Sequence, residues 1–300
     1  MSGLETSVQA ENLDNVEGSP GDPQRRRPRR RLNGSLLVGG GLVGLVLVMA
    51  LVSFVWTPAD PTRVEATQTL LPPGGEHLLG TDHYGRDILS QLLVGARTTL
   101  FVGVVAVAIA GVLGVPLGLV GASARRRVSE PLMRMLDIVF AFPAVLLAII
   151  LAAGFGASTL TAMIAIGVAT VPVFARLTRA ASLQVLASDY VLAARSYGRR
   201  GAALMRRYVL PNIAAVLTVQ ASVAFAIAIL AEAALSYLGF GTAPPTPSWG
   251  RMLQEAQNYL VVEPLLAFWP GVAIALAVLG FNLLGDGLRD ALDPRLAERR

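Results

Sequence analysis

The sequence predicts an all-α integral membrane protein with six transmembrane helices. Of its 300 residues, 54% are hydrophobic and only 15% are charged, whereas a soluble domain usually carries about 25% charged residues. Six apolar segments reach the length that a helix needs to cross a bilayer, about 20 residues. The basic residues are all arginine, and they gather in alternate connections between these segments, as the positive-inside rule expects.

Residues 1–34 form a polar, acidic segment rich in Gly, Pro and Ser that ends in an arginine cluster at 25–31. This composition predicts a disordered cytoplasmic tail. The next segment, 35–56, is apolar, longer than a typical signal-peptide core, and lacks a convincing cleavage site, so we expect an uncleaved first span. For the arginine cluster we prefer a role in membrane orientation to the binding of nucleic acid.

Five further spans are predicted, and the arginine-rich connections place both termini in the cytoplasm. The approximate ranges of these spans are 98–122, 132–154, 158–174, 213–235 and 265–284. We divide the chain after the tail into a first span with an outer segment (35–96), a transmembrane domain (97–290) and a cytoplasmic carboxyl-terminal tail (291–300).

Small residues, rather than charges, characterise the spans. Gly111, Gly114, Gly118 and Gly121 recur at three- and four-residue spacing, which lets helix backbones approach closely. Ionisable residues are nearly absent from the spans, and Glu232 is expected at the membrane interface. This scarcity disfavours a carrier that couples transport to a buried carboxylate.

The polar residues form no catalytic constellation. The chain has no cysteine, which excludes disulfides, thiolate metal sites and cysteine nucleophiles. His77 and His83 lie near Asp82 and Asp87 in the first outer loop, where we prefer solvated or capping roles to a metal site. The sequence also lacks a GxxxxGK(S/T) phosphate loop. We therefore expect no catalysis, no metal and no cofactor in this chain.

A long arginine-rich loop, predicted at 176–211 on the cytoplasmic side, separates the fourth and fifth spans. Its second half, 190–211, reads YVLAARSYGRRGAALMRRYVLP. The pattern predicts a helix, a turn at Gly198 and a second short helix before Pro211. Connections between helices usually have only a few residues, so we interpret the loop as a docking protrusion rather than an ordinary linker.

This segment resembles the cytoplasmic coupling loop of ABC importer permeases, whose pattern is Glu-Ala-Ala, three residues, Gly, nine residues and Ile-x-Leu-Pro. The two alanines, the glycine and the Leu-Pro pair match at the correct spacing. Leu192 and Tyr208 replace the Glu and the Ile. The resemblance implies an ATPase-coupling role for Asp189, Ala193, Ala194, Arg195, Gly198, Leu210 and Pro211.

Three other stretches narrow the resemblance to the C-type permease subunit of dipeptide and oligopeptide importers. They are 77–103 before the second span, 232–253 after the fifth span, and 285–296 at the carboxyl end. The outer motif comprises Gly80, Thr81, Asp82, Gly85, Arg86 and Asp87. The carboxyl-terminal motif comprises Asp286, Arg289, Asp290, Asp293 and Pro294, at spacings that suit helical ion pairs. In the second stretch, Trp249 suits the bilayer interface.

The resemblance implies a type I ABC importer permease fold and a non-catalytic subunit that forms half of a peptide pathway in the cell inner membrane. The implied partners are a homologous permease, two ATPase subunits that bind ATP and Mg, and an external solute-binding protein. A nickel, glutathione or opine permease is the alternative within the family. A channel or secondary transporter that works alone is disfavoured by the scarce charges in the spans.

Overall fold

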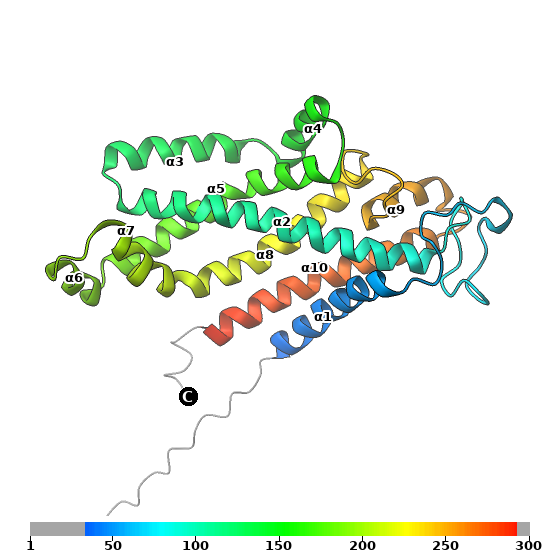
Figure 1. Ribbon diagram of the computed structural model, residues 1–300, viewed down its shortest axis with the longest axis horizontal. Helices are drawn as coiled ribbons and strands as arrows, with labels where there is room; N and C mark the ends of the chain where they lie inside the picture. The colour runs from blue at the N-terminus through cyan, green and yellow to red at the C-terminus, as the bar shows by residue number, and fades with distance from the viewer. Residues whose placement is uncertain (1–33, 293–300) are drawn as a thin grey trace, which may run out of the picture.

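The computed structural model describes residues 34–292, which form an elongated bundle with most helices running along its length (Figure 1). Within this part of the chain the regular elements are all helical, as the sequence predicts. Predictions about residues 1–33 and 293–300, including the tail, Asp293 and Pro294, fall outside the described residues.

The elements follow one another in the order α1 (Gly34–Val55), η1 (Ala66–Gln68), α2 (Ile88–Ser123), α3 (Arg126–Ala141), α4 (Ala144–Phe155), α5 (Thr159–Leu186), α6 (Asp189–Ser196), α7 (Gly201–Leu204), η2 (Met205–Val209), α8 (Leu210–Tyr237), α9 (Trp249–Ala256), η3 (Gln257–Tyr259) and α10 (Leu265–Leu292). The η elements are short 3-10 segments, except η2, which is a π-helical turn.

Five helices of the described chain are long and apolar enough to cross a membrane: α1, α2, α5, α10 and the continuous helix Gly201–Tyr237. The predicted span at 132–154 is instead broken into α3 and α4, which meet at 81°. Pro143 causes the break, because proline disfavours helical geometry in the residue before it. Phe142 is accordingly extended, with φ −82° and ψ 122°. Counted as one bent span, the pair gives the predicted six.

Two long helices extend beyond the apolar segments that predict them. The helix α2 begins at Ile88 rather than near residue 98, and α5 continues to Leu186 rather than ending near residue 174. Hydropathy detects where a helix leaves the apolar layer, whereas its backbone hydrogen bonds continue through polar residues. The predicted loop 176–211 therefore begins with the last turns of α5.

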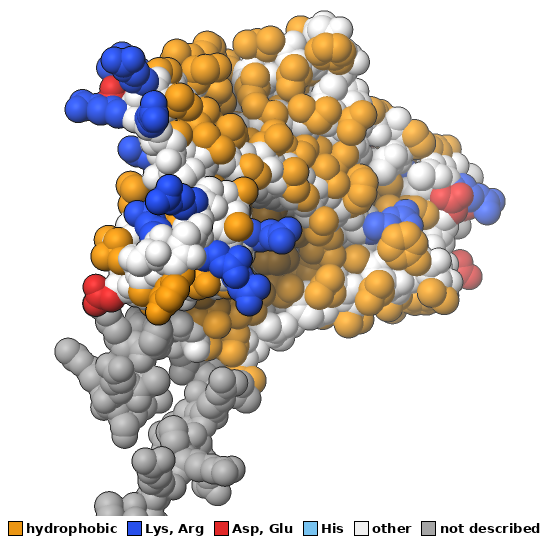
Figure 2. All heavy atoms as spheres, turned by 60° about the vertical axis from the view of Figure 1, so that its left-hand side comes forward, with side chains coloured by type: hydrophobic (Ala, Val, Ile, Leu, Met, Phe, Trp, Pro, Cys, Tyr) orange, Lys and Arg blue, Asp and Glu red, His pale blue; other side chains and the backbone are white. Residues whose placement is uncertain are grey.

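The bundle has two chemically different ends. The first, here called the arginine end, carries α6, α7 and the turn between α2 and α3; the start of α1 and the end of α10 lie on the same side (Figure 1). Figure 2 shows arginine side chains gathered over this end, separated by hydrophobic surface. The opposite end carries α9 and the segment 56–87 between α1 and α2 (Figure 1).

Close backbone contact holds α2 against α5, as the glycine spacing predicts. A β-carbon on Gly118 would lie 2.5 Å from the carbonyl oxygen of Ala175, and one on Gly114 would lie 2.8 Å from that of Val171. Both distances are too short for real atoms, so only glycine fits. Gly111 differs, because a β-carbon there would meet nothing within 4 Å. The face of α2 that lies in close contact with α5 thus includes fewer of these glycines than their spacing in the sequence indicates.

Gly118→Leu should disrupt the α2–α5 contact, because the obstructing atom belongs to the backbone of Ala175 and cannot turn aside. We expect overpacking to lower the free energy of unfolding by about 1–3 kcal/mol or more, seen as a lower midpoint of thermal unfolding in detergent. Gly111→Leu, two turns earlier on the same helix, is the matched control and should leave the midpoint nearly unchanged. Equal effects of the two substitutions would refute the packing argument.

Candidate coupling and outer-motif sites

The connection between α5 and α8, residues 187–209, is packed as part of the bundle. Val191 is fully buried and Ala194 nearly so on the inner face of α6. They join a hydrophobic cluster with residues from the end of α5, from α7 and from the start of α8. The buried members of this cluster are Leu186, Val191, Ala194, Leu204, Met205, Val209 and Ile213. Because apolar contacts tie α6 to both long helices, the three elements cannot shift independently at low cost.

Gly198 ends α6 in the way that the sequence predicts. Its backbone N–H donates to the carbonyl of Arg195 at 2.9 Å, and the N–H of Arg199 donates to that of Ala194 at 3.1 Å. These two bonds form a Schellman motif, in which the residue after the helix adopts a left-handed conformation. Gly198 has φ +81°, and a β-carbon there would meet nothing within 4 Å. The position therefore selects glycine for backbone geometry and not for lack of space.

The second helix predicted in this segment runs directly into the membrane span. Residues Gly201–Tyr237 form one continuous helix, in which η2 is a widened turn and the N–H of Leu210 donates to the carbonyl of Met205. Pro211 has no N–H to donate to the preceding turn, which explains why the regular pattern is interrupted here. The Leu-Pro pair thus lies within the helix rather than at the start of a separate one.

An exposed face of mixed apolar and basic character covers the outside of the connection. Tyr197 is 89% exposed, and Tyr190 and Leu192 are about half exposed. Ala193 is also exposed, whereas its neighbour Ala194 is buried. We call these residues, together with the exposed arginines around them, the elbow surface: Tyr190, Leu192, Ala193, Arg195, Tyr197, Arg199, Arg200, Arg206 and Arg207. Asp189 lies exposed in the first turn of α6, where a carboxylate is favourable for the helix dipole.

At the opposite end, the outer motif is held by a buried ion-pair network. Asp82 Oδ2 accepts hydrogen bonds from Arg86 Nε at 2.7 Å and Gln91 Nε2 at 2.9 Å. Arg86 also binds Glu255 of α9, whose other oxygen accepts from Arg251 Nε at 2.8 Å. Burial acts to lower the pKa of Arg86, but the charges of Asp82 and Glu255 outweigh it and raise that pKa. The network joins the start of α2 to α9.

Asp87 fixes the beginning of α2. Its Oδ1 accepts from the Ser90 backbone N–H at 2.7 Å as an N-cap, and its Oδ2 lies 2.9 Å from His77 Nδ1. His77 thus supports the helix cap through its contact with Asp87 rather than capping the helix itself. Gly85 has φ +77°, and a β-carbon there would overlap the carbonyl of Glu65. The turn in the outer motif thus requires a glycine at this position.

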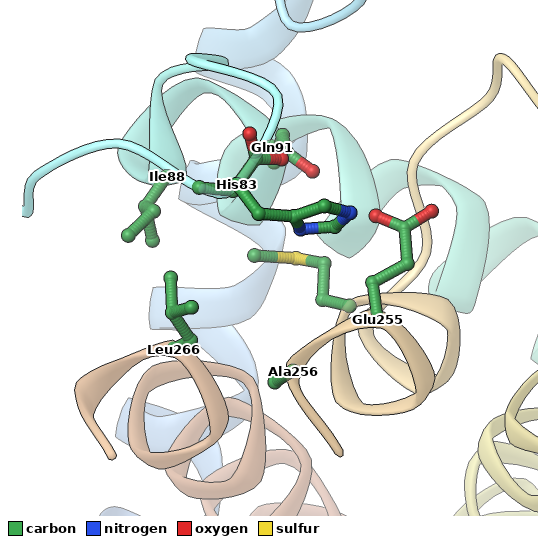
Figure 3. Close-up of a pocket in the computed structure, with 8 residues that line it drawn as sticks. His83, Ile88, Gln91, Glu255, Ala256 and Leu266 are labelled. Atoms are coloured by element: carbon green, nitrogen blue, oxygen red, sulfur yellow. Dashed lines mark hydrogen bonds between the residues drawn. The ribbon is translucent and has the colours of Figure 1, made fainter. Parts of the chain in front are cut away.

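Asp82, His83 and Glu255 could in principle hold a metal ion, since one ligand atom from each lies within 4.8 Å of the others. Figure 3 shows His83, Gln91 and Glu255 around the small pocket where they meet. However, both carboxylates already bind Arg86, which would repel a cation. The pocket has about 10 Å³ of free volume, at the lower limit for a single water molecule. The arrangement fits an ion-pair network better than a metal centre.

Glu232 is buried inside the protein, which sequence reasoning missed. It is 1% exposed near the end of α8, and its Oε1 accepts from Ser236 Oγ at 2.7 Å and Thr242 Oγ1 at 3.3 Å. Thr242 Oγ1 in turn accepts from Thr159 Oγ1, at the start of α5, at 3.3 Å. This hydroxyl network links α8 to α5 at the end of the bundle opposite the elbow surface.

Trp249 was expected at the bilayer interface, and this prediction is wrong. The indole is 1% exposed and its Nε1–H donates to the carbonyl of Leu92 at 3.0 Å. It lies against Gly95, where a β-carbon would come within 2.6 Å of the ring. A buried indole needs a hydrogen-bond partner, and here α2 supplies both the partner and the space. The tryptophan thus anchors α9 to α2.

Of the carboxyl-terminal motif, Asp286, Arg289 and Asp290 lie exposed in the last turns of α10. Asp286 and Arg289 form no ion pair with each other in the described chain, so helical pairing between these two is absent.

The protein-family comparison matches residues 114–298 to the binding-protein-dependent transport system inner membrane component. This chain belongs to that family, and it is a multi-pass permease subunit of the ABC importer type. The match begins in α2 and includes the whole connection between α5 and α8.

Several curated proteins are similar over most of the chain. A putative peptide transport system permease protein of Brucella suis is 42% identical over 91% of this chain and 90% of its own length. The di/tripeptide transport system permease protein DppC of Pseudomonas aeruginosa is 43% identical over 86% and 88%.

The MetNI methionine ABC transporter, solved in an inward-facing conformation, shares the fold. The match has a TM-score of 0.58 and 18% identity, and it covers 68% of this chain and 96% of that chain. At this identity the likeness supports the architecture alone.

Arg86→Met should destabilise the opposite end of the bundle, because it leaves Asp82 and Glu255 buried without their shared cation. We expect the free energy of unfolding to fall by about 3–5 kcal/mol, measured as a lower midpoint of thermal unfolding of the purified protein. Arg63→Met is the matched control. Its guanidinium pairs with Glu65 but is 73% exposed, so the loss should not exceed about 1 kcal/mol. A similar small effect at Arg86 would contradict the network.

Proposed function

We propose that this permease forms half of the translocation pathway of an importer for di- and oligopeptides. The substrate class is supported by relatives at 42–43% identity whose names specify peptide transport. The glutathione transport system permease protein GsiD of Pectobacterium atrosepticum is also similar, at 38% identity. The alternative within the family is therefore a permease for glutathione, a peptide derivative, and the peptide assignment is favoured by the greater identity.

The proposed assembly contains a homologous second permease, two ATPase subunits and an external solute-binding protein. The arginine end faces the cytoplasm, since an excess of arginine marks the cytoplasmic side of membrane proteins. The ATPase subunits dock on the elbow surface, where exposed aromatic and arginine side chains have the composition of a protein interface. ATP and its Mg²⁺ bind to these partners, and the present chain holds neither.

The observation that carries the mechanism is the burial of Val191 and Ala194 against both flanking helices. When the ATPase subunits close, they displace α6, and the packed cluster passes the displacement to α5 and α8 together. At the opposite end, the network of Glu232, Thr242 and Thr159 keeps the same two helices in register. The helices thus act as one lever that shifts the population between inward- and outward-facing states.

Gly198→Val tests this mechanism. A β-branched residue is strained at φ +81°, so the Schellman motif should open and α6 should lose its place on the elbow surface. We expect peptide uptake to fall at least tenfold, the effect of about 1.4 kcal/mol, while the amount of protein in the membrane is unchanged. Uptake is measured with a labelled dipeptide, and with labelled glutathione to distinguish the two substrates.

Gly75→Val is the control for this substitution. Gly75 also has a positive φ, +54°, and free space around its β-carbon, but it lies in the segment at the opposite end. This variant should transport normally. Normal uptake by the Gly198→Val variant would contradict a role of the elbow surface in the mechanism. If the unchanged protein takes up glutathione but not dipeptides, only the proposed substrate is wrong.

A further inference from the structure

An apolar groove of about 590 Å³ lies between α1 and α2, in the half of the bundle away from the arginine end. Its walls come from α1, α2, the first residue of α5 and the loop before α9. The lining residues are Leu47, Ala50, Leu51, Phe54, Arg97, Thr98, Leu100, Phe101, Val104, Thr159 and Thr246. Of these residues, only Thr159 also belongs to the proposed transport mechanism, through its hydrogen bond to Thr242.

The groove is polar at one end and apolar along the rest. Leu47 and Leu51 are one turn apart on α1, and Phe101 and Val104 continue the apolar wall on α2; all four are about half exposed. The polar side chains collect beside the loop before α9. Thr98 Oγ1 donates to the carbonyl of Pro247 at 3.1 Å, which brings Thr246 next to the helical turn that carries Arg97.

Arg97 is the only cation among the residues that line the groove. Its guanidinium carbon lies 4.5 Å from the centre of the Phe54 ring, and in the described chain it forms no ion pair with a carboxylate. Phe54 is the next-to-last residue of α1, and Trp56 is the first residue after that helix. Arg97 therefore lies at the depth where α1 leaves the apolar layer, which is where lipid phosphates and the positive ends of arginines meet.

We propose that the groove binds one phospholipid. The phosphate accepts hydrogen bonds from the Arg97 guanidinium, whose planar array of donors suits a phosphate, and Thr246 adds an exposed hydroxyl. One acyl chain lies along Leu51 and Val104, where the contact removes gaps between the chain and the helix surface. A groove with one cation at its polar end and apolar walls along the rest matches an amphiphile with one anionic head. This charge complementarity favours a lipid over an apolar helix of a neighbouring subunit.

The test uses the complete transporter complex purified in detergent and titrated with phosphatidylglycerol, with bound lipid counted by native mass spectrometry. Arg97→Gln should weaken binding about tenfold or more, the usual effect of losing one charge-assisted hydrogen bond. Leu51→Trp should block the acyl-chain part of the groove and also lower binding. Arg97→Lys, which keeps the charge, should bind more lipid than Arg97→Gln.

Arg63→Gln is the matched control, because it removes an exposed arginine at the same end outside the groove. It should bind as much lipid as the unchanged protein. Binding that is equal in all variants would overturn the proposal. So would a thiol cross-link to the second permease subunit from Leu51→Cys, which introduces one cysteine into a chain that has none, because a protein partner would then fill the groove. Neither outcome depends on which solute is transported.

Discussion

The burial of α6 against the ends of α5 and α8 is the contact on which the functional account depends. Val191, Ala194 and Val209 have little or no exposed surface, and they belong to one cluster with residues of both long helices. Without this contact, α6 could move without displacing α5 or α8. With the contact in place, a displacement at the arginine end must be shared by two helices that each reach the opposite end.

The rest of the bundle makes such a lever effective. Glycines allow α2 to lie in backbone contact with α5, so α5 has a stiff neighbour along its length. At the opposite end, Trp249 and the Arg86 network hold α9 and the segment 56–87 on α2, while the hydroxyls around Glu232 join α8 to α5. Stiffness at both ends matters because packed interiors transmit strain instead of absorbing it.

Sequence reasoning predicted the features that depend on local chemistry. The turn at Gly198 and the close approach at Gly118 each follow from what a single residue type permits. It could not predict that α5 continues to Leu186, since polar helical turns have no hydropathy signal. Nor could it locate Glu232 and Trp249, whose partners lie on other helices. The broken span at Pro143 is intermediate: a proline is known to interrupt a helix, but residue type alone does not give the 81° angle of the bend.

Cross-linking from Ala193 tests the central claim most directly. Because the chain has no cysteine, Ala193→Cys can carry a single benzophenone on the exposed face of α6, and Ala243→Cys can carry one at the opposite end. In the assembled transporter, the account expects light-induced cross-links from position 193 to an ATPase subunit and none from position 243. Cross-links to the ATPase from position 243 only, or from neither position, would contradict it.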